Sequence, residues 1–163
     1  MIRPLEEKDI EVVCGIVNEN WKNVYAGYIN PLLLNADGCA ERIHQLKLDF
    51  ITHRLSEYVW EEQNQVSAML SFGDTADTDL AEAFEIWRIY VAPQFQKKGI
   101  GKLLLEFAEK QAKRQGYKRI VIWAFKDNYR AVSFYQKHGY CIDKEEYLKE
   151  PYLAIGTRLK KEI

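Results

Sequence analysis

The chain has 163 residues, of which 47% are apolar and 29% are charged. This length and composition predict one globular domain, residues 1–163, and exclude a disordered chain. The chain has 23 Lys and Arg residues and 24 Asp and Glu residues, so its net charge is close to zero. Proteins that bind nucleic acid usually have an excess of basic residues, and no nucleic-acid partner is therefore expected.

The N-terminal residues, MIRPLEEKDI, have no apolar signal core, and no stretch approaches the ~20 apolar residues that a membrane span needs. We therefore expect a cytoplasmic protein with no membrane partner. Residues 1–5 predict a first strand, and apolar residues at helical spacing predict helices over about 8–22 and 37–47. The aromatic segment between these helices, 23–34, is either a packed connector or the wall of a pocket.

The middle of the chain predicts strands. Residues 58–62 and 66–73 flank a polar turn and are typical of an antiparallel hairpin, and the acidic residues 74–82 predict a loop. Residues 83–92 predict a central strand, because both of its faces are largely apolar. Strict alternation places its side chains on two faces: Glu85, Trp87, Ile89 and Val91 on one, and Ile86, Arg88 and Tyr90 on the other.

The C-terminal half alternates helices and strands. A strong helical stripe follows Gly99 and ends at Gly116, and the β-branched run 119–125 predicts a buried strand. Asn128 is placed to cap a further helix, and late strands are expected at 140–143 and 152–159. The order β α α β β β α β α β β predicts the α/β class with a mixed sheet.

One stretch, EIWRIYVAPQFQKKGIG from Glu85 to Gly101, combines a strand, a basic turn and a glycine-opened helix. Such an arrangement presents backbone N–H groups to an anion, and the glycines let a ligand approach the backbone. It is either a phosphate cradle or an ordinary strand-to-helix connection. A Walker loop and a Rossmann fingerprint do not fit, since Leu103 and Leu104 stand where Ser or Thr and a third glycine are required.

Three motifs in order resemble the Gcn5-related N-acetyltransferase (GNAT) family. They are IYVAPQFQKKGIGKLLL, which contains the pattern Q/R-x-x-G-x-G/A at 96–101, then Asn128, and then SFYQKHGY at 133–140. The resemblance implies a mostly antiparallel central sheet, flanked by helices, whose central strands splay apart. It also implies acetyl-CoA as the cosubstrate.

The resemblance further implies the cofactor contacts. The pyrophosphate would lie on backbone N–H groups of Gln96, Lys97, Lys98, Gly99, Ile100, Gly101 and Lys102, and the lysines are either phosphate ligands or a solvated basic turn. The pantetheine arm would pair with the backbone of Ile89 and Val91, much as an added strand does. A backbone N–H within Ile89–Val91, a range that includes Tyr90, would meet the thioester oxygen. Asn128 would contact the cofactor near the pantetheine, in addition to capping its helix.

Acetyl transfer to an amine requires a base for the amine and an acid for the leaving thiolate. Because a lysine-type amine has a pKa of about 10.4, a base or a water chain to one is needed at neutral pH. By family analogy Glu85 is the candidate base, the alternative being a solvated residue at the end of a strand. Tyr135 is the candidate acid, the alternative being a core aromatic residue.

The expected activity is therefore direct acetyl transfer from acetyl-CoA to a primary amine of a small molecule or a peptide. A non-catalytic acyl-CoA-binding or regulatory module is the alternative, and a structural subunit that forms a homodimer through its exposed late strands, without any ligand, is a further hypothesis. The three cysteines are far apart and lack a C-x-x-C pair, so we expect free thiols and no metal site. The acceptor itself has no diagnostic motif.

Overall fold

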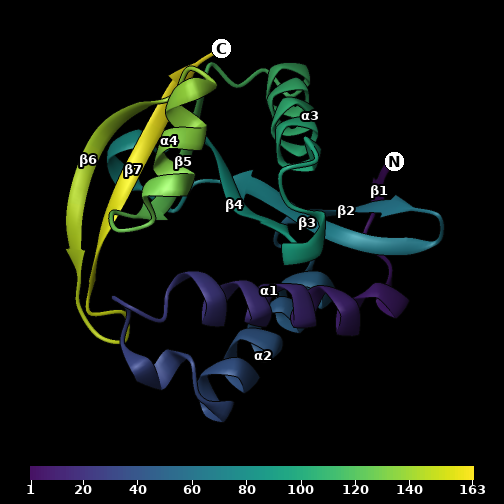
Figure 1. Ribbon diagram of the computed structural model, residues 1–163. Helices are drawn as coiled ribbons and strands as arrows, with labels where there is room; N and C mark the ends of the chain where they lie inside the picture. Colours follow the sequence, from purple (N-terminus) through teal and green to yellow (C-terminus); the bar gives the residue numbers. More distant parts are fainter.

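The computed structural model describes residues 1–163, which form one seven-stranded sheet with two α-helices against each face (Figure 1). The strands are β1 (Ile2–Pro4), β2 (Ser56–Glu62), β3 (Gln65–Asp74), β4 (Phe84–Val91), β5 (Arg119–Phe125), β6 (Cys141–Leu148) and β7 (Ala154–Glu162). The α-helices are α1 (Ile10–Val24), α2 (Ala36–Thr52), α3 (Ile100–Arg114) and α4 (Tyr129–Lys137). Short 3₁₀ turns lie at Glu7–Asp9, Pro31–Leu33, Thr78–Leu80 and Pro93–Phe95.

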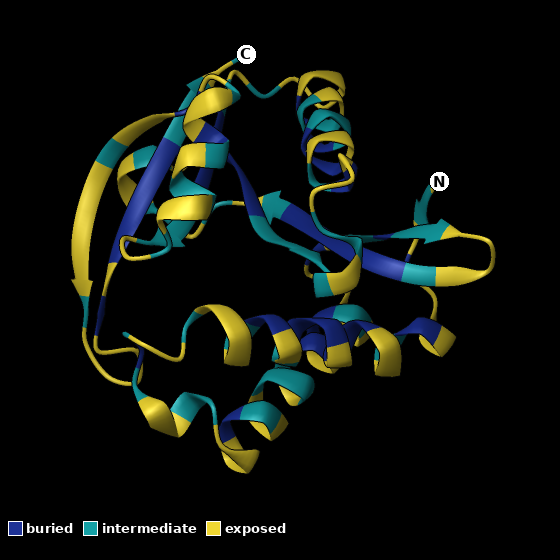
Figure 2. Cartoon of the chain, in the orientation of Figure 1, coloured by how far each residue is buried: buried dark blue, intermediate teal, exposed yellow.

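The sheet separates two apolar clusters. The strands lie in the order β1-β2-β3-β4-β5-β7-β6, with α1 and α2 on one face and α3 and α4 on the other (Figure 1). The larger cluster lies under α3 and α4 and includes Phe72, Leu104 and Tyr140, and the smaller one, with Val13 and Met69, lies under α1 and α2. Each such side chain stabilises the fold by about 1.5–3 kcal/mol. Figure 2 shows this core as dark blue along the central strands, whereas the edge strand β6 is mostly exposed.

The predicted order of elements and the mixed sheet are confirmed. The boundaries of several elements differ. Strand β6, with 8 residues, is much longer than the expected 140–143, whereas β7, with 9 residues, is close in length to the expected 152–159. The extension of β6 covers the charged residues 144–146, which are exposed on an edge strand and therefore carry no alternating apolar pattern. Pairing with β7, not hydrophobicity, keeps this segment extended.

The expected splay of the central strands is present. The strands β4 and β5 are the only parallel neighbours, and they pair only through Phe84–Ile120, Glu85–Val121 and Ile86–Ile122. Beyond that point, residues 88–91 of β4 pair with β3 alone, and residues 123–125 of β5 pair with β7 alone. The sheet therefore opens at the carboxyl ends of its two parallel strands.

A β-bulge in β4 overturns the predicted distribution of its side chains. Phe72 pairs with Ile86 and Ser71 pairs with Arg88, so Trp87 has no partner on β3. The extra residue shifts the later positions of β4 by one, and a shift of one residue exchanges the two faces of a strand. Glu85 therefore shares its face with Arg88 and Tyr90 on the α1 and α2 side. Ile89 and Val91 pack in the cluster under α3 with Ile86.

The helices of the chain do not include one long and apolar enough to cross a bilayer. All three cysteines are free thiols: Cys14 is buried, Cys39 is half-buried and Cys141 is exposed.

Candidate active site

A cleft of about 800 Å³ lies where β4 and β5 separate. Its lining comes from the splayed strands, from the turn before α3, from α4, and from the end of α1. Eleven of the thirteen predicted site residues line it: Glu85, Ile89, Tyr90, Val91, Gln96, Lys97, Gly99, Gly101, Lys102, Asn128 and Tyr135. The cleft thus brings together residues from three separate sequence motifs.

The two remaining residues do not line the cleft. Ile100 is 5% exposed and packs in the core under α3, so only its backbone could meet a ligand. The Lys98 ammonium lies 4.9 Å from the centre of the Phe95 ring. Lys98 is exposed and its side chain lies outside the lining of the cleft, so its contact with the coenzyme stays a prediction.

The turn before α3 leaves backbone N–H groups free. Gly99 is the N-cap of α3 and supplies no side chain to cap it, and the Leu103 N–H makes a 3.1 Å bond to the Gly99 carbonyl. The N–H groups of residues 100–102 precede that bond and have no carbonyl of the helix to bind. Together with the positive end of the helix dipole, they form a site suited to an anion.

The two glycines of the turn are required for different reasons. Gly99 has φ +84, a left-handed conformation that costs a residue with a side chain roughly 1–2 kcal/mol. Gly101 has no such angle, and a Cβ built there would meet Phe134 and Val91 only at ordinary distances, 3.7 and 4.0 Å. Because neither conformation nor packing requires glycine at 101, its open position fits the close approach of a ligand. This observation is consistent with the coenzyme that the motif implies.

Side-chain amides hold the turn against β4. Gln96 Nε2 donates to the Val91 carbonyl at 3.0 Å, and Asn20 Nδ2 of α1 donates to the same oxygen at 3.1 Å. Arg130 of α4 donates to Gln96 Oε1 at 2.9 Å and so joins α4 to the turn. Asn20 and Arg130 were missed in the sequence, because single polar residues on a helix carry no motif.

The edge of β4 that faces the gap carries unpaired backbone groups. The Ala92 N–H bonds the Ser67 carbonyl, and hydrogen-bonded pairs alternate along an antiparallel ladder. Tyr90 therefore directs its backbone groups to β3, whereas Ile89 and Val91 direct theirs into the gap. Of these, only the Val91 carbonyl is already occupied, by Gln96 and Asn20. The N–H groups of Ile89 and Val91 and the Ile89 carbonyl can meet an extended ligand.

Asn128 caps α4 as predicted, since its side-chain oxygen accepts from the Ala131 N–H at 3.2 Å. Its amide NH₂ group remains a donor on the wall of the cleft. We call the turn 96–102 and helix α4 with Asn128 the glycine wall.

Glu85 is a buried carboxylate on the opposite side of β4 from α3. It is 6% exposed, and its Oε2 accepts from Thr75 Oγ1 at 2.8 Å and from the Ala76 N–H at 3.4 Å. Burial raises the pKa of Glu85 above that of an ordinary glutamate, although the Thr75 hydrogen bond opposes the shift. A carboxyl group with a raised pKa on a cleft wall is suited to accept a proton near neutral pH.

Tyr135 reaches the cleft from α4. It is 7% exposed, and burial raises the pKa of its phenol well above the usual range. The group therefore keeps its proton at neutral pH, which is the state in which an acid must begin. The ring also packs in the core under α3 and α4, so Tyr135 both lines the cleft and belongs to the core.

Aromatic residues close the cleft on the α1 side. Phe125, the last residue of β5, lies 6.0 Å from Trp21, 4.9 Å from Tyr25 and 6.0 Å from Tyr152, measured between ring centres. These four residues all line the cleft, and we call them the aromatic wall. Trp21 Nε1 also donates to the Tyr90 hydroxyl at 3.0 Å.

The predicted interpretation of 23–34 as a pocket wall holds at Val24 and Tyr25, which line the cleft. The rest of the aromatic wall was missed, because its members come from segments far apart in the sequence. Asn30 holds Tyr152 next to the segment that follows α1, since the Asn30 N–H donates to the Tyr152 carbonyl at 3.0 Å.

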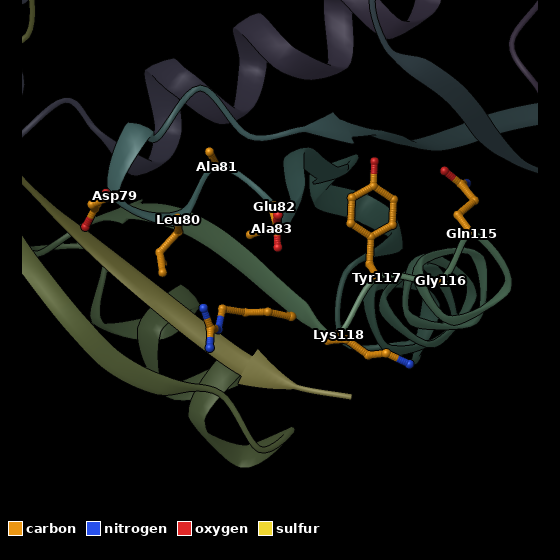
Figure 3. A pocket seen from close by; sticks show the side chains of 10 residues that line it. Asp79, Leu80, Ala81, Glu82, Ala83, Gln115, Gly116, Tyr117 and Lys118 are labelled. Atoms are coloured by element: carbon orange, nitrogen blue, oxygen red, sulfur yellow. The ribbon is translucent and has the colours of Figure 1, made fainter.

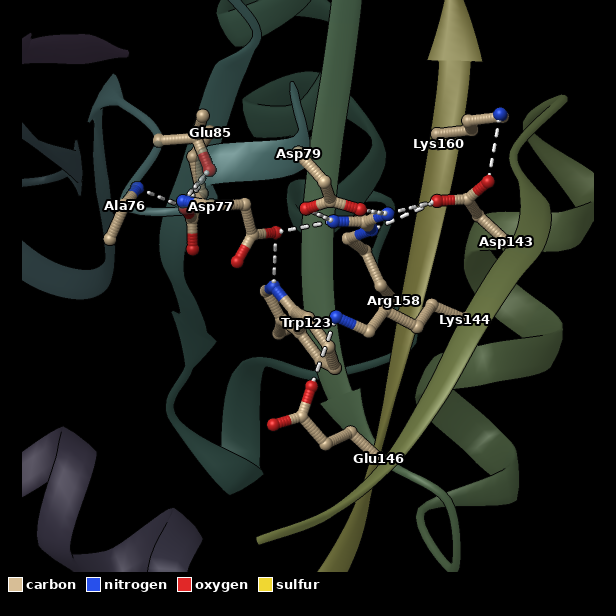
Figure 4. A network of polar contacts seen from close by, with 11 residues as sticks. Ala76, Asp77, Asp79, Glu85, Trp123, Asp143, Lys144, Glu146, Arg158 and Lys160 are labelled. Atoms are coloured by element: carbon tan, nitrogen blue, oxygen red, sulfur yellow. Dashed lines mark hydrogen bonds and ion pairs between the residues drawn. The ribbon is translucent and has the colours of Figure 1, made fainter. Parts of the chain in front are cut away.

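The acidic loop 74–82 is bound to the interior of the protein. Arg158 of β7 is 3% exposed and makes two 2.8 Å bonds to Asp79 and a 3.0 Å bond to Asp77 (Figure 4). Trp123 Nε1 donates to the same Asp77 oxygen at 2.9 Å. The same loop carries Thr75 and Ala76, so the Arg158 contacts hold the residues that bind Glu85.

A second cavity, of about 620 Å³, lies between residues 79–83 and 115–119, at the start of β4 and β5 (Figure 3). It is at the end of the parallel pair opposite to the cleft, and none of the predicted site residues lines it.

The acetyltransferase (GNAT) family profile matches residues 21–140, about three quarters of the chain. The chain belongs to the GNAT family. It is accordingly an acetyltransferase that uses acetyl-CoA.

Individual relatives agree with this assignment. A spermidine N(1)-acetyltransferase of Thermoplasma acidophilum is 30% identical over 151 residues, which cover 87% of this chain and 88% of the relative. In fold, the chain resembles a PaiA N-acetyltransferase of Thermoplasma acidophilum solved with coenzyme A, with a TM-score of 0.76, 21% identity and coverage of 100% and 98% of the two chains. It also resembles a ribosomal-protein-alanine N-acetyltransferase of Brucella melitensis, with a TM-score of 0.77, 19% identity and coverage of 100% and 99%. These likenesses confirm the predicted fold class.

Proposed function

We propose that this GNAT acetyltransferase transfers the acetyl group directly to the primary amine of a small molecule, with Glu85 as the base and Tyr135 as the acid. The observation that carries the proposal is that both residues line the same cleft as the glycine turn, although they come from opposite faces of the sheet. The curated relative named for spermidine supports a small-molecule amine as the acceptor.

The proposed roles follow from the state of each group. The Glu85 carboxylate takes the proton of the ammonium, so that the amine nitrogen can bond to the carbonyl carbon. Tyr135 gives its proton to the sulfur atom as the carbon–sulfur bond breaks, and the second proton shed by the attacking nitrogen replaces it. A backbone N–H of Ile89 or Val91 stabilises charge on the carbonyl oxygen.

The glycine wall is proposed to bind the coenzyme. The free N–H groups of residues 100–102 would receive the pyrophosphate, with Lys97 and Lys102 adding positive charge on the wall of the cleft. The gap-facing edge of β4 would pair with the pantetheine arm, and the Asn128 amide would donate to it.

Release of free thiol from acetyl-CoA, measured across a panel of primary amines, tests the proposal. We expect at least one amine to raise release well above the rate of hydrolysis, and acetyl-CoA to bind in calorimetry. If acetyl-CoA binds but no amine from a broad panel raises thiol release, the chain is the non-catalytic acyl-CoA-binding module instead.

A further inference from the structure

The charges around the cleft indicate how many ammonium groups the acceptor carries. We infer that the acceptor is a primary monoamine with an apolar alkyl or arylalkyl body, and not a polyamine. The inference rests on the proposed function, in which the reacting amine meets Glu85.

The lining of the cleft contains one carboxylate, that of Glu85. The positively charged lining residues are Arg88, Lys97, Lys102, Arg130 and Lys137. Lys97 and Lys102 are assigned above to the coenzyme phosphates, and Arg88 is paired with Asp49. A second or third ammonium in this cleft would still find no free carboxylate on the lining, and burying an unpaired charge is costly. The lining can neutralise one ammonium group, placed next to Glu85.

Carboxylates just behind the lining are bound to arginines. Asp49 of α2 is fully buried and accepts from Arg88 at 2.6 Å and from Arg54 at 2.7 Å. Glu57 of β2 lies 3.7 Å from Arg88 and accepts from Ser71 at 3.2 Å. An acceptor could recruit either carboxylate only by breaking a buried ion pair, which would leave an arginine uncompensated.

The acidic loop 74–82 lies outside the lining of the cleft, and two of its carboxylates are bound to an arginine. Asp77 and Asp79 share the buried guanidinium of Arg158, and the two bonds to Asp79 are bidentate (Figure 4). Bidentate pairs between arginine and carboxylate are among the strongest polar contacts in proteins. Asp77 and Asp79 are therefore bound within the protein, and no carboxylate of residues 74–82 lines the cleft.

The aromatic wall supplies the opposite kind of surface. Phe125 has Trp21, Tyr25 and Tyr152 around it, and together they offer apolar area to the body of a ligand. The Arg42 guanidinium lies 4.3 Å from the centre of the Trp21 ring, so this ring already makes a cation–π contact within the protein. An apolar body fits this wall better than an additional ammonium.

Two matched pairs of acceptors test the inference: hexylamine against hexamethylenediamine, which adds only a second ammonium, and phenethylamine against spermidine. We expect the kcat/KM of each monoamine to exceed that of its partner at least about tenfold, equal to about 1.4 kcal/mol. Equal or higher values for the diamine and for spermidine overturn the inference and leave the proposed function standing. Failure of all four amines and of the broad panel, with acetyl-CoA still bound, removes the proposed function itself.

Variants of the aromatic wall provide a second test. Phe125→Ala is expected to raise the KM for phenethylamine about tenfold and to affect methylamine, which is too small to reach the wall, much less. Tyr152→Ala, at a site that is 38% exposed, is the second variant if Phe125→Ala does not fold, and Tyr147→Ala on the exposed strand β6 is the control. Equal losses for phenethylamine and methylamine would contradict a role in recognising the acceptor body.

Discussion

The two walls of the cleft present different chemical groups to a ligand. The glycine wall offers mainly backbone groups from one continuous turn, whereas the aromatic wall consists of side chains that come from the end of α1, the end of β5 and the turn before β7. A backbone site depends on a few conformational requirements within a short stretch. A side-chain site depends on how distant segments pack, so one fold can keep its cofactor site while its acceptor site varies.

The candidate acid and the candidate base also lie on different sides of the cleft. Tyr135 belongs to the glycine wall through α4, whereas Glu85 lies on the face of the sheet that carries α1 and α2. The bulge at Trp87 creates this division, since it moves Ile89 and Val91 to the face opposite Glu85. The following substitutions probe the two sides separately.

Replacement of the proposed base has the largest expected effect. Glu85→Gln should lower kcat about 10²–10⁴-fold, because an amide cannot accept the ammonium proton while its oxygen still accepts from Thr75 and Ala76. In the wild type, kcat/KM should rise with pH as Glu85 loses its proton, through a pKa raised above the ordinary glutamate value. The variant should lack that limb of the pH profile.

The stability of the same variant separates function from folding. A carboxyl group whose pKa is raised in the folded state stabilises the fold less as pH rises through that pKa. Glu85→Gln should therefore leave Tm at neutral pH unchanged or increase it. A large fall in Tm together with the loss of activity would indicate a structural role instead.

Removal of the proposed acid has the next largest effect. Tyr135→Phe should lower kcat about a hundredfold, because the leaving sulfur loses its proton donor. The ring keeps its packing under α3 and α4, so calorimetry should show nearly the same affinity for acetyl-CoA. Unchanged turnover would remove Tyr135 from the acid role.

The sequence predicted the glycine wall better than the aromatic wall, for physical reasons. Gly99 and Gly101, the helix stripe after them and the Asn128 cap are local signals, and each has its own conformational cause. By contrast, the bulge at Trp87 depends on how β4 pairs with β3, and alternation along one strand does not record it. The contacts of Phe125 and Arg158 join residues far apart in the chain and have no local signature.

Comparison of the two glycines tests whether the glycine wall acts through its backbone. Gly101→Ala should weaken acetyl-CoA binding about tenfold in calorimetry, because a Cβ narrows the approach to the backbone. Its Tm should not fall, since the site has no positive φ and no close contact. Gly99→Ala should instead lower Tm, because a residue with a side chain at φ +84 destabilises the fold by about 1 kcal/mol or more. Equal affinities for the wild type and Gly101→Ala would remove residue 101 from the coenzyme site.

The smallest expected effect concerns the acidic loop 74–82. The hydrogen bonds from Arg158 lower the pKa of Asp79 to about 2, so this carboxylate stabilises the fold above the ordinary aspartate pKa of about 3.9 and loses that contribution as pH falls toward 2. Asp79→Asn should therefore lower Tm by a few degrees at pH 7, and the difference from the wild type should shrink as pH falls below about 4.

Glu41→Gln, which removes an exposed carboxylate with no ion pair, is the matched control and should leave Tm unchanged at both pH values. The KM of Asp79→Asn for its best amine should equal that of the wild type, because Arg158 already occupies this carboxylate. A selective rise in the KM for polyamines would instead make Asp79 part of the acceptor site, and the aromatic wall would then share its role with an acidic one.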